Sequence, residues 1–286
     1  MFLFIGIAIV IGCVLGGYAM VHGNFSMLIQ PAELVIIFGS GLGSLVIASP
    51  IRVLKLIVGN IKLLLAASGA SKSIYVDILM LLFTILMKAR KEGLIAIEND
   101  VYKPKESPLF QNYPKIISDH HLLDFICDNL KVIVSVGAKP NELDDLMELD
   151  IDVRHHEENI PPGSLTKLSD SLPGLGIVAA VLGIVVTMGK INEPPEVLGH
   201  HIGAALVGTF LGILASYGFM GPMATNLEFK MQEKSVCFSV ARTVLFAFAK
   251  GTMPQMAIEY GRRAIPMYDR PSFDEMSDLM KNAKSK

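Results

Sequence analysis

The residue types that most often carry chemistry are present in this sequence, but their spacing does not suit catalysis or metal binding. Apart from His22, the histidines come as adjacent pairs, at positions 120–121, 155–156 and 200–201. Neighbouring residues on a helix point about 100° apart, so such a pair does not offer two ligands to one metal ion. The sequence contains no nucleophile elbow, no phosphate loop and no HExxH pattern. We therefore expect no metal, no cofactor and no enzymatic activity.

Composition argues against further classes of function. The three cysteines, Cys13, Cys127 and Cys237, are far apart and form no CxxC pair, which fits a soluble part in a reducing cytoplasm. The formal net charge of -2 argues against a nucleic-acid surface. Hydrophobic residues make up 51% of the 286 residues and charged residues 18%, against about 25% charged in an average soluble domain. The apolar excess is gathered in blocks, which is typical of a membrane protein.

Four of these blocks contain no charge and are about long enough to cross a hydrocarbon core of ~30 Å as helices. They are Phe2–Met20, Leu34–Ala48 with short flanks, Leu172–Met188 and Ile202–Met220. The predicted fold class is an all-α integral membrane protein with four transmembrane helices, a large helical cytoplasmic loop and a helical cytoplasmic tail. The first block has no basic leader, so we interpret it as a retained span. Because these spans hold no acidic or basic side chain, a titrating group for ion transport would have to come from elsewhere.

The distribution of Lys and Arg sets the predicted topology. The connection 21–33 has none, the stretch 51–168 has fourteen, the connection 189–201 has only Lys190, and the tail after 221 has ten. The loop, the tail and both termini are therefore expected in the cytoplasm. The predicted divisions are 1–50 for the first two transmembrane helices, 51–168 for the loop, 169–222 for the last two transmembrane helices, and 223–286 for the tail.

One apolar segment of the loop has two interpretations. Ile74–Met87 has only 14 residues, contains Asp77 and is bounded by Lys72 and Lys88. Segments of that length are more often buried core helices than spans. A fifth span would also separate the basic tail from part of the basic loop. We therefore favour a cytoplasmic core helix over a fifth span.

The soluble parts are predicted to be helical without strands, because nothing alternates with period two over a useful length. Helices are expected over 74–98, 116–136 and 140–156, and in the tail from Pro222 to about Pro254. The run Ile160–Ser164 contains two prolines and is expected to end the third of these helices before the next span. The acidic run Glu142–Glu158 is interpreted as a solvated face.

Several residues could serve ion transport or movement, although each also has an ordinary explanation. GxxxG pairs at 12/16, 39/43 and 208/212 let helix backbones approach closely in lipid, or reflect the usual glycine content of spans. Thr209 could line a hydrated path, or bond back to the carbonyl one turn earlier. Pro173 and Pro222 could be hinges or ordinary helix ends. The charged stretch Lys88–Asp100 could dock a partner or simply be solvated.

Four parts of the sequence resemble the bacterial flagellar stator protein family MotA. They are Gln30–Ile37, Asp170–Ala180, Val207–Leu214, and Arg262 together with Arg270–Phe273. The resemblance covers nearly the whole chain, with the four predicted spans in register. It implies a pentamer of this chain in the bacterial inner membrane, arranged around the single spans of two MotB chains. Protons would pass along that interface to a MotB aspartate, which would account for the lack of an acidic group in the spans. The ring would then turn and push the rotor protein FliG.

The resemblance also assigns residue roles. Arg90 and Glu98 match the charged pair that meets FliG, and Pro173 and Pro222 match prolines that couple ion passage to movement. Thr209 matches the pore-facing hydroxyl near the MotB aspartate.

Ala180 bears on the type of ion. Sodium-driven members of the family tend to have Thr at this position. A sodium ion needs several oxygens to replace its hydration, whereas a proton needs only a titrating group and a water path. We therefore expect a proton-driven stator. Two other interpretations are an energiser of envelope transport or gliding of the ExbB/TolQ type, which usually has three spans, and a passive membrane scaffold.

Overall fold

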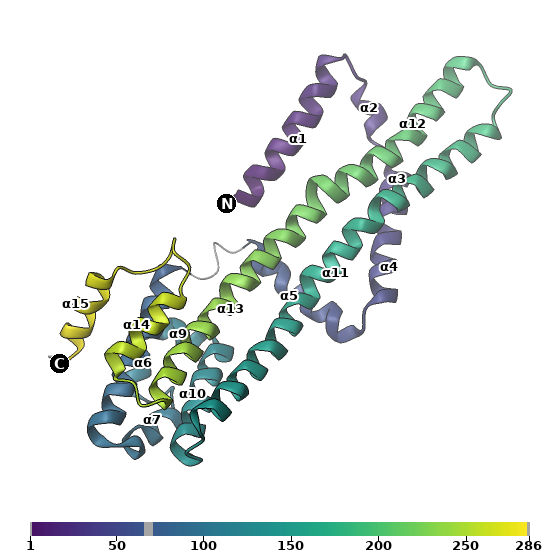
Figure 1. Ribbon diagram of the computed structural model, residues 1–286. Coiled ribbons are helices and arrows are strands. Elements are labelled where there is room, and N and C mark those ends of the chain that lie inside the picture. Colours follow the sequence, from purple (N-terminus) through teal and green to yellow (C-terminus); the bar gives the residue numbers. More distant parts are fainter. Residues whose placement is uncertain (1, 66–70, 285–286) are drawn as a thin grey trace. The chain divides into compact units, whose positions relative to one another are not determined.

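The computed structural model describes residues 2–65 and 71–284, and the regular elements in these residues are all helices (Figure 1). The prediction of an all-α chain is therefore confirmed. Four helical stretches are long and apolar enough to cross a membrane: Phe2–Met20, Phe25–Ala48, Pro140–Met188 and Pro195–Ala249. The chain forms two compact units, which we describe separately: a membrane unit, residues 1–67 and 158–229, and a loop unit, residues 68–157 and 230–286.

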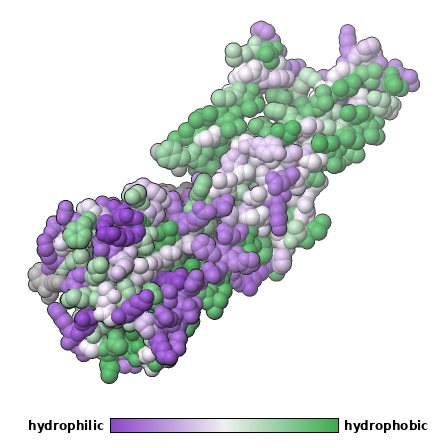
Figure 2. Space-filling view, viewed as in Figure 1, coloured by the Kyte–Doolittle hydropathy of each residue, from purple (hydrophilic) through white to green (hydrophobic). Residues whose placement is uncertain are grey.

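The first span, α1 (Phe2–Met20), buries none of its residues against the rest of the described chain. Its closest packing is against η3 (Leu214–Met220), where an added Cβ at Gly218 would lie 3.3 Å from Val10. Large apolar side chains such as Phe4 and Ile9 are exposed on α1. On the face of the membrane unit seen in Figure 2, green hydrophobic residues form large patches with paler and purple residues between them. Exposed apolar surface of this extent is expected for helices that face lipid or other chains.

The second span is built from short helical pieces rather than one regular helix. Two short helices, α2 (Phe25–Leu28) and α3 (Pro31–Leu34), lead into the π-helical turn η1 (Val35–Gly39) and then α4 (Ser40–Ala48). Pro31 occupies the first turn of α3, where the missing N–H costs no helical hydrogen bond. The second span therefore begins earlier than predicted.

The third span belongs to one long helix, α11 (Pro140–Met188), which contains Pro161, Pro162 and Pro173. The predicted break at Ile160–Ser164 is therefore wrong. The helix persists because it keeps one buried face on both sides of the prolines, and tertiary packing of such a face outweighs a local preference. The buried residues that recur at helical spacing are Leu143, Met147, Ile151, Leu165, Leu172 and Ala179.

The fourth span also continues where an end was predicted. Helix α12 (Pro195–Ile213) runs into the π-helical η3, and η3 runs into α13 (Gly221–Ala249). In this π register the N–H of Gly221 donates to the carbonyl of Ser216, five residues back. Pro222 therefore lies inside a continuous helical stretch, and its interpretation as a helix stop is wrong. The interruption predicted near Pro254 is confirmed, because α13 ends at Ala249 and the next helix begins at Pro254.

The loop unit is organised around α6 (Lys72–Glu92), whose residues from Tyr75 to Ala89 are mostly buried in its core. Burial among helices of the same unit confirms the interpretation of Ile74–Met87 as a core helix rather than a fifth span. The helix ends at Gly93, which has a φ of +91° that L residues rarely adopt. The predicted single helix over 74–98 is therefore split at this glycine.

Short helices complete the loop unit around this core. The helix predicted over 116–136 is also split, because the Asp119 side chain accepts a hydrogen bond from the N–H of Leu122 and caps a new helix there. The remaining helices are η2 (Leu94–Ile97), α7 (Glu98–Tyr102), α8 (Pro108–Gln111), α9 (Pro114–Ser118), α10 (His120–Ser135), α14 (Pro254–Ala264) and α15 (Phe273–Lys284). In the membrane unit, α5 (Ile51–Leu65) follows the second span.

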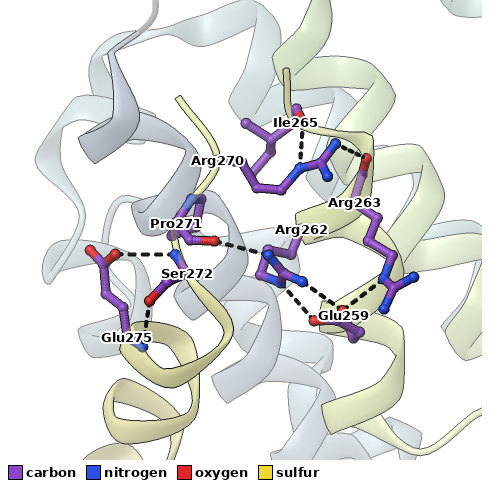
Figure 3. Close-up of polar contacts among 8 residues, drawn as sticks. All are labelled: Glu259, Arg262, Arg263, Ile265, Arg270, Pro271, Ser272 and Glu275. Carbon is purple, nitrogen blue, oxygen red and sulfur yellow. Dashed lines mark hydrogen bonds and ion pairs between the residues drawn. The ribbon is translucent and has the colours of Figure 1, made fainter. Parts of the chain in front are cut away.

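Ionic contacts fix the turn between α14 and α15 (Figure 3). The Glu259 carboxylate accepts two hydrogen bonds from Arg262, at 2.7 and 2.8 Å, and one from Arg263 at 2.8 Å. Arg262 also donates to the carbonyl of Pro271 at 3.0 Å, which ties α14 to the segment that precedes α15. These bonds, chiefly those from Arg262, lower the pKa of Glu259 to about 2. The carboxylate is therefore ionised at neutral pH.

Candidate functional site

The helices of the third and fourth spans, α11 and α12, meet through glycines with no side chain between them. A Cβ added at Gly212 would lie 2.6 Å from the carbonyl oxygen of Leu172 and 2.8 Å from the Cα of Gly176. A Cβ added at Gly176 would lie 2.8 Å from the carbonyl oxygen of Gly208. Distances under 3.0 Å are not tolerated by real Cβ atoms, so only glycine allows the backbones to come this close.

The three GxxxG pairs therefore differ in what they contact. The pair Gly208 and Gly212 packs against α11, as the motif suggests. At positions 12, 16, 39 and 43 an added Cβ would meet nothing within 4 Å in the described part of the chain. Those two pairs make no close helix contact with the described residues.

Three of the predicted site residues lie at or beside this crossing. Thr209 follows Gly208 directly and is half-buried, and its Cα would lie 3.3 Å from a Cβ on Gly176. Pro173 follows Leu172, whose carbonyl touches Gly212, so it lies at the level of Gly212. Ala180 is buried, 6% exposed, one turn along α11 from Gly176. The structure thus brings Pro173 and Thr209 to one helix crossing, although they are far apart in sequence.

Pro222 lies beside a buried pair of hydroxyls that sequence reasoning missed. Ser169 on α11 donates to the Ser216 carbonyl at 3.1 Å, and the two hydroxyl oxygens are also 3.1 Å apart. A Cβ on Gly221 would be 3.3 Å from the Ser169 Oγ. Both serines are buried, and their bonds join α11 to η3 directly before Pro222. The sequence could have indicated this contact, because each of the two apolar helices contains a small polar residue that needs a hydrogen-bond partner.

An acidic residue inside the second span is the second feature that was missed. Glu33 is 8% exposed, and its Oε2 has no hydrogen-bond partner. It lies within the span candidate Phe25–Ala48. The expectation that no span holds an acidic side chain is therefore wrong. Glu33 had been assigned to the connection 21–33, because the run Leu34–Ala48 that follows it is uniformly uncharged.

The predicted rotor-binding residues, Arg90 and Glu98, are both exposed in the loop unit. Arg90 lies in the last turn of α6 and donates to the Gly251 carbonyl at 3.4 Å. Glu98 begins α7, so the prediction that both charges lie on one helix over 74–98 is wrong. They are separated by Gly93 and the short helix η2.

An ion pair beside these two residues fixes their separation. Lys88 Nζ lies 2.8 Å from Asp100 Oδ2, and the Ser107 hydroxyl donates to Asp100 Oδ1 at 2.6 Å. Asp100 is 6% exposed, and Ala89 and Ile97 are also buried, so the prediction that the stretch Lys88–Asp100 is a solvated face is wrong at these positions. Each member of the pair lies two residues from a predicted contact residue, Lys88 from Arg90 and Asp100 from Glu98. The pair thereby connects α6 to α7 and orders the surface between them.

The acidic run and one of the histidine pairs have structural contacts within the loop unit. Arg242 on α13 donates to Asp144 at 2.7 Å and to Glu148 at 3.1 Å. His155 Nε2 lies 2.6 Å from the Ser235 hydroxyl. The carboxylates of α11 therefore hold α13 in this unit instead of facing water only. No group of three or more His, Cys, Asp or Glu residues in the described ranges could hold a metal ion.

Comparison with known proteins places these features in a family. The family model for the N-terminal region of motility protein A matches residues 4–93, and that of the MotA/TolQ/ExbB proton channel family matches residues 118–238. The chain is 39% identical to motility protein A of Escherichia coli strain K12 over 285 residues, which cover 100% of this chain and 97% of that protein. It is 33% identical to chemotaxis protein LafT of Vibrio parahaemolyticus over 273 residues, 96% of each chain.

Solved structures show the same fold. The chain matches a structure of MotAB from C. jejuni with a TM-score of 0.78 and 16% identity, covering 95% of this chain and 98% of that one. It matches the flagellar MotAB stator complex from Bacillus subtilis with a TM-score of 0.76 and 22% identity, covering 96% and 100%.

Proposed function

This chain belongs to the motility protein A family, and we propose that it is a stator subunit that converts proton flow across the bacterial inner membrane into torque on the flagellar rotor. The observation that carries the proposal is the glycine crossing of α11 and α12, which sets Thr209 and Pro173 together in a membrane unit. The similarity over the full chain length supports the same role.

The membrane aspartate is proposed to come from a partner of the MotB type. The third and fourth spans, from Leu172 to Met188 and from Ile202 to Met220, contain no acidic side chain that could relay a proton. The two solved relatives are MotAB complexes, and five copies of this chain around the single spans of two partners would give the arrangement expected from the family resemblance. Thr209 would then face the partner aspartate, and Ala180 would lie along the same path.

The exposed pair Arg90 and Glu98 is proposed as the surface that meets the rotor protein FliG. Charged groups on an exposed surface direct partner choice and are sensitive to salt. Arg90→Glu should abolish or greatly weaken swarming while the protein still inserts and assembles. Reversal of the matching charge on the rotor should restore part of the motility. Normal swarming in the double variant Arg90→Glu, Glu98→Lys would refute docking at this surface.

The direction of insertion is proposed from the positions of Lys and Arg, with the loop, the tail and both termini in the cytoplasm. Two exposed glutamates make a matched test in a background without native cysteines. A cysteine that replaces Glu193, between the last two spans, should react with an impermeant maleimide added outside. A cysteine that replaces Glu106, in the loop unit, should react only after the membrane is opened. Labelling of both from outside would contradict this topology.

The proton is proposed as the driving ion because Ala180 offers no hydroxyl where a sodium path would need further oxygens. Swimming speed should follow the proton-motive force, collapse with a protonophore, and stay flat as external sodium varies at constant ionic strength. A speed that rises and saturates with sodium would overturn this assignment. Thr209→Ala should slow the motor without always stopping it, since a water path can remain.

A further inference from the structure

Glu33 is an acidic side chain within a span candidate, and no described residue pairs with it. Glu33 is 8% exposed, and its Oε2 is fully enclosed and accepts no hydrogen bond from the described residues. Buried carboxylates in proteins almost always accept hydrogen bonds or pair with a cation. An unpartnered acid in a membrane span is therefore a candidate for function rather than for structure.

The carboxyl group occupies a notch made by small residues of α11 and α12. A Cβ added at Gly208 would overlap the Glu33 Oε2, and it would lie 3.1 Å from the Glu33 Cδ. A Cβ added at Gly183 would lie 3.6 Å from the Glu33 Oε1 and 2.7 Å from the Cβ of the buried Ala205. Glycine at position 208 therefore leaves the space that the carboxyl group fills, whereas a Cβ at position 183 would clash with Ala205 and make only an ordinary contact with the carboxyl group.

Among the described residues, no charged group faces this carboxyl from the elements that pack against it. Helix α3 contacts η1, which has no titratable residue, and it contacts α12; the notch itself includes Gly183 of α11. On α11, Asp170 is 13 residues before Gly183, about 20 Å along the helix. His201 is seven residues before Gly208, about 10 Å along α12, and its Nε2 is already 3.1 Å from Lys190 Nζ. The titratable groups in the turn between α11 and α12 and in the first turns of α12 are Lys190, Glu193, Glu196, His200 and His201.

The charge state of Glu33 follows from this isolation. An ionised carboxylate at this position would lose its hydration, and no cation or hydrogen-bond donor would compensate for the lost free energy. A neutral carboxylic acid has no such cost.

We propose that Glu33 is a proton-binding site built into this chain, additional to any acidic group of a partner. Binding transfers a proton from a hydronium ion, in water that reaches the notch, to Glu33 Oε2. The products are a carboxylic acid and a water molecule. Release reverses the step when water re-enters between α3 and α12. This proposal does not depend on torque or on the identity of a partner.

Infrared spectroscopy tests the protonation state directly. The full chain is purified from membranes in its assembled complex, reconstituted in lipid and measured at pH about 7, where an exposed glutamate, with a pKa of about 4.3, is almost wholly ionised. We expect the C=O stretch of a protonated carboxylic acid, which disappears in Glu33→Gln. The matched control is Glu196→Gln, an exposed glutamate of α12, which should leave the band unchanged.

Isotope labelling keeps the test valid if Glu33→Gln does not assemble. Incorporation of carboxyl-¹³C glutamate into the unchanged complex should shift the band, while protonated aspartates keep their frequency. Loss of the band in Glu33→Gln supports the site. A shift on labelling supports it when the shifted band persists in Glu233→Gln, because Glu233 is the other described glutamate with an enclosed, unpartnered carboxyl oxygen. Identical spectra for Glu33→Gln and the unchanged complex, or the absence of any label-sensitive band, would overturn it. None of these readouts requires a working motor, so failure of this proposal and failure of the stator function are distinguishable.

Discussion

Replacing Gly212 by alanine tests whether the contact of the α11 and α12 backbones matters for function. The new Cβ would lie 2.6 Å from the Leu172 carbonyl oxygen, whereas ordinary contacts begin at 3.4 Å, so it needs about 0.8 Å more room. The obstructing atoms are backbone, so no side chain can rotate away. The two helices must therefore separate at this point.

The expected cost follows from how helices associate in lipid. Without a hydrophobic drive between spans, close packing supplies much of the attraction. A gap of about 0.5–1 Å forfeits roughly a quarter to a half of the dispersion energy of the atoms involved. Overpacking of this kind costs about 1–3 kcal/mol, and alanine regains at most about 1 kcal/mol through its better helix propensity. We expect a net destabilisation of about 1–2 kcal/mol. We also expect a large loss of torque, because Thr209 lies at the same helix crossing as Gly212 and would move with it.

The assay compares Gly212→Ala with Gly199→Ala on the same helix. A Cβ at Gly199 meets nothing within 4 Å of the described chain, so that variant gains helix propensity without a clash. Heating the purified complexes and measuring the assembled fraction by size-exclusion chromatography gives relative stability, and tethered cells give torque. The reasoning fails if Gly212→Ala matches the unchanged protein in both measurements, or if Gly199→Ala is equally impaired.

Three further predictions concern the proposed rotor surface, Pro173 and the tail. Asp100→Asn should weaken the ion pair with Lys88 and reduce swarming although Arg90 is unchanged, whereas full swarming would show that the pair does not position the rotor surface. Pro173→Ala should insert and assemble normally but produce much less torque in tethered cells; unchanged torque would remove its coupling role. The Glu259 pKa of about 2 lies below its ordinary 4.5, so the carboxylate stabilises the tail above pH about 4.5, by no more than about 3 kcal/mol, and this contribution is lost as pH falls toward 2. Glu259→Gln should therefore speed amide exchange in α14 at pH 7 and flatten its change with pH; an exchange rate equal to that of the unchanged protein at pH 7 would contradict the assignment.

The spans and the core helix of the loop unit could be predicted because they depend on composition and length alone. An uncharged stretch of sufficient length has few alternatives to a membrane helix, and the 14-residue segment Ile74–Met87 is too short for one. The same reasoning failed at Glu33, because one acidic residue beside an apolar run was counted as a boundary. A small-residue notch on two other helices, far away in sequence, accommodates this side chain.

The helix boundaries were the least predictable part of the fold. Pro161 and Pro162 indicate a break by every local rule, yet α11 passes through them because its buried face continues on both sides. Residue types alone identified Thr209 and Pro173 as candidates, but not that they meet at one crossing. The contact of Ser169 with Ser216 likewise depends on how two helices pack, and such pairing is not encoded in either segment by itself.

Helix α1 buries none of its residues within the chain, so the bilayer has a large share in its placement. Its 19 residues span about 28 Å as a helix, slightly less than a hydrocarbon core of ~30 Å. A helix of this length has little freedom to tilt, because tilting would draw its ends into the hydrocarbon. The thickness of the membrane therefore affects the tilt of α1. A thicker bilayer must thin locally around α1, and a thinner one allows the helix to lean.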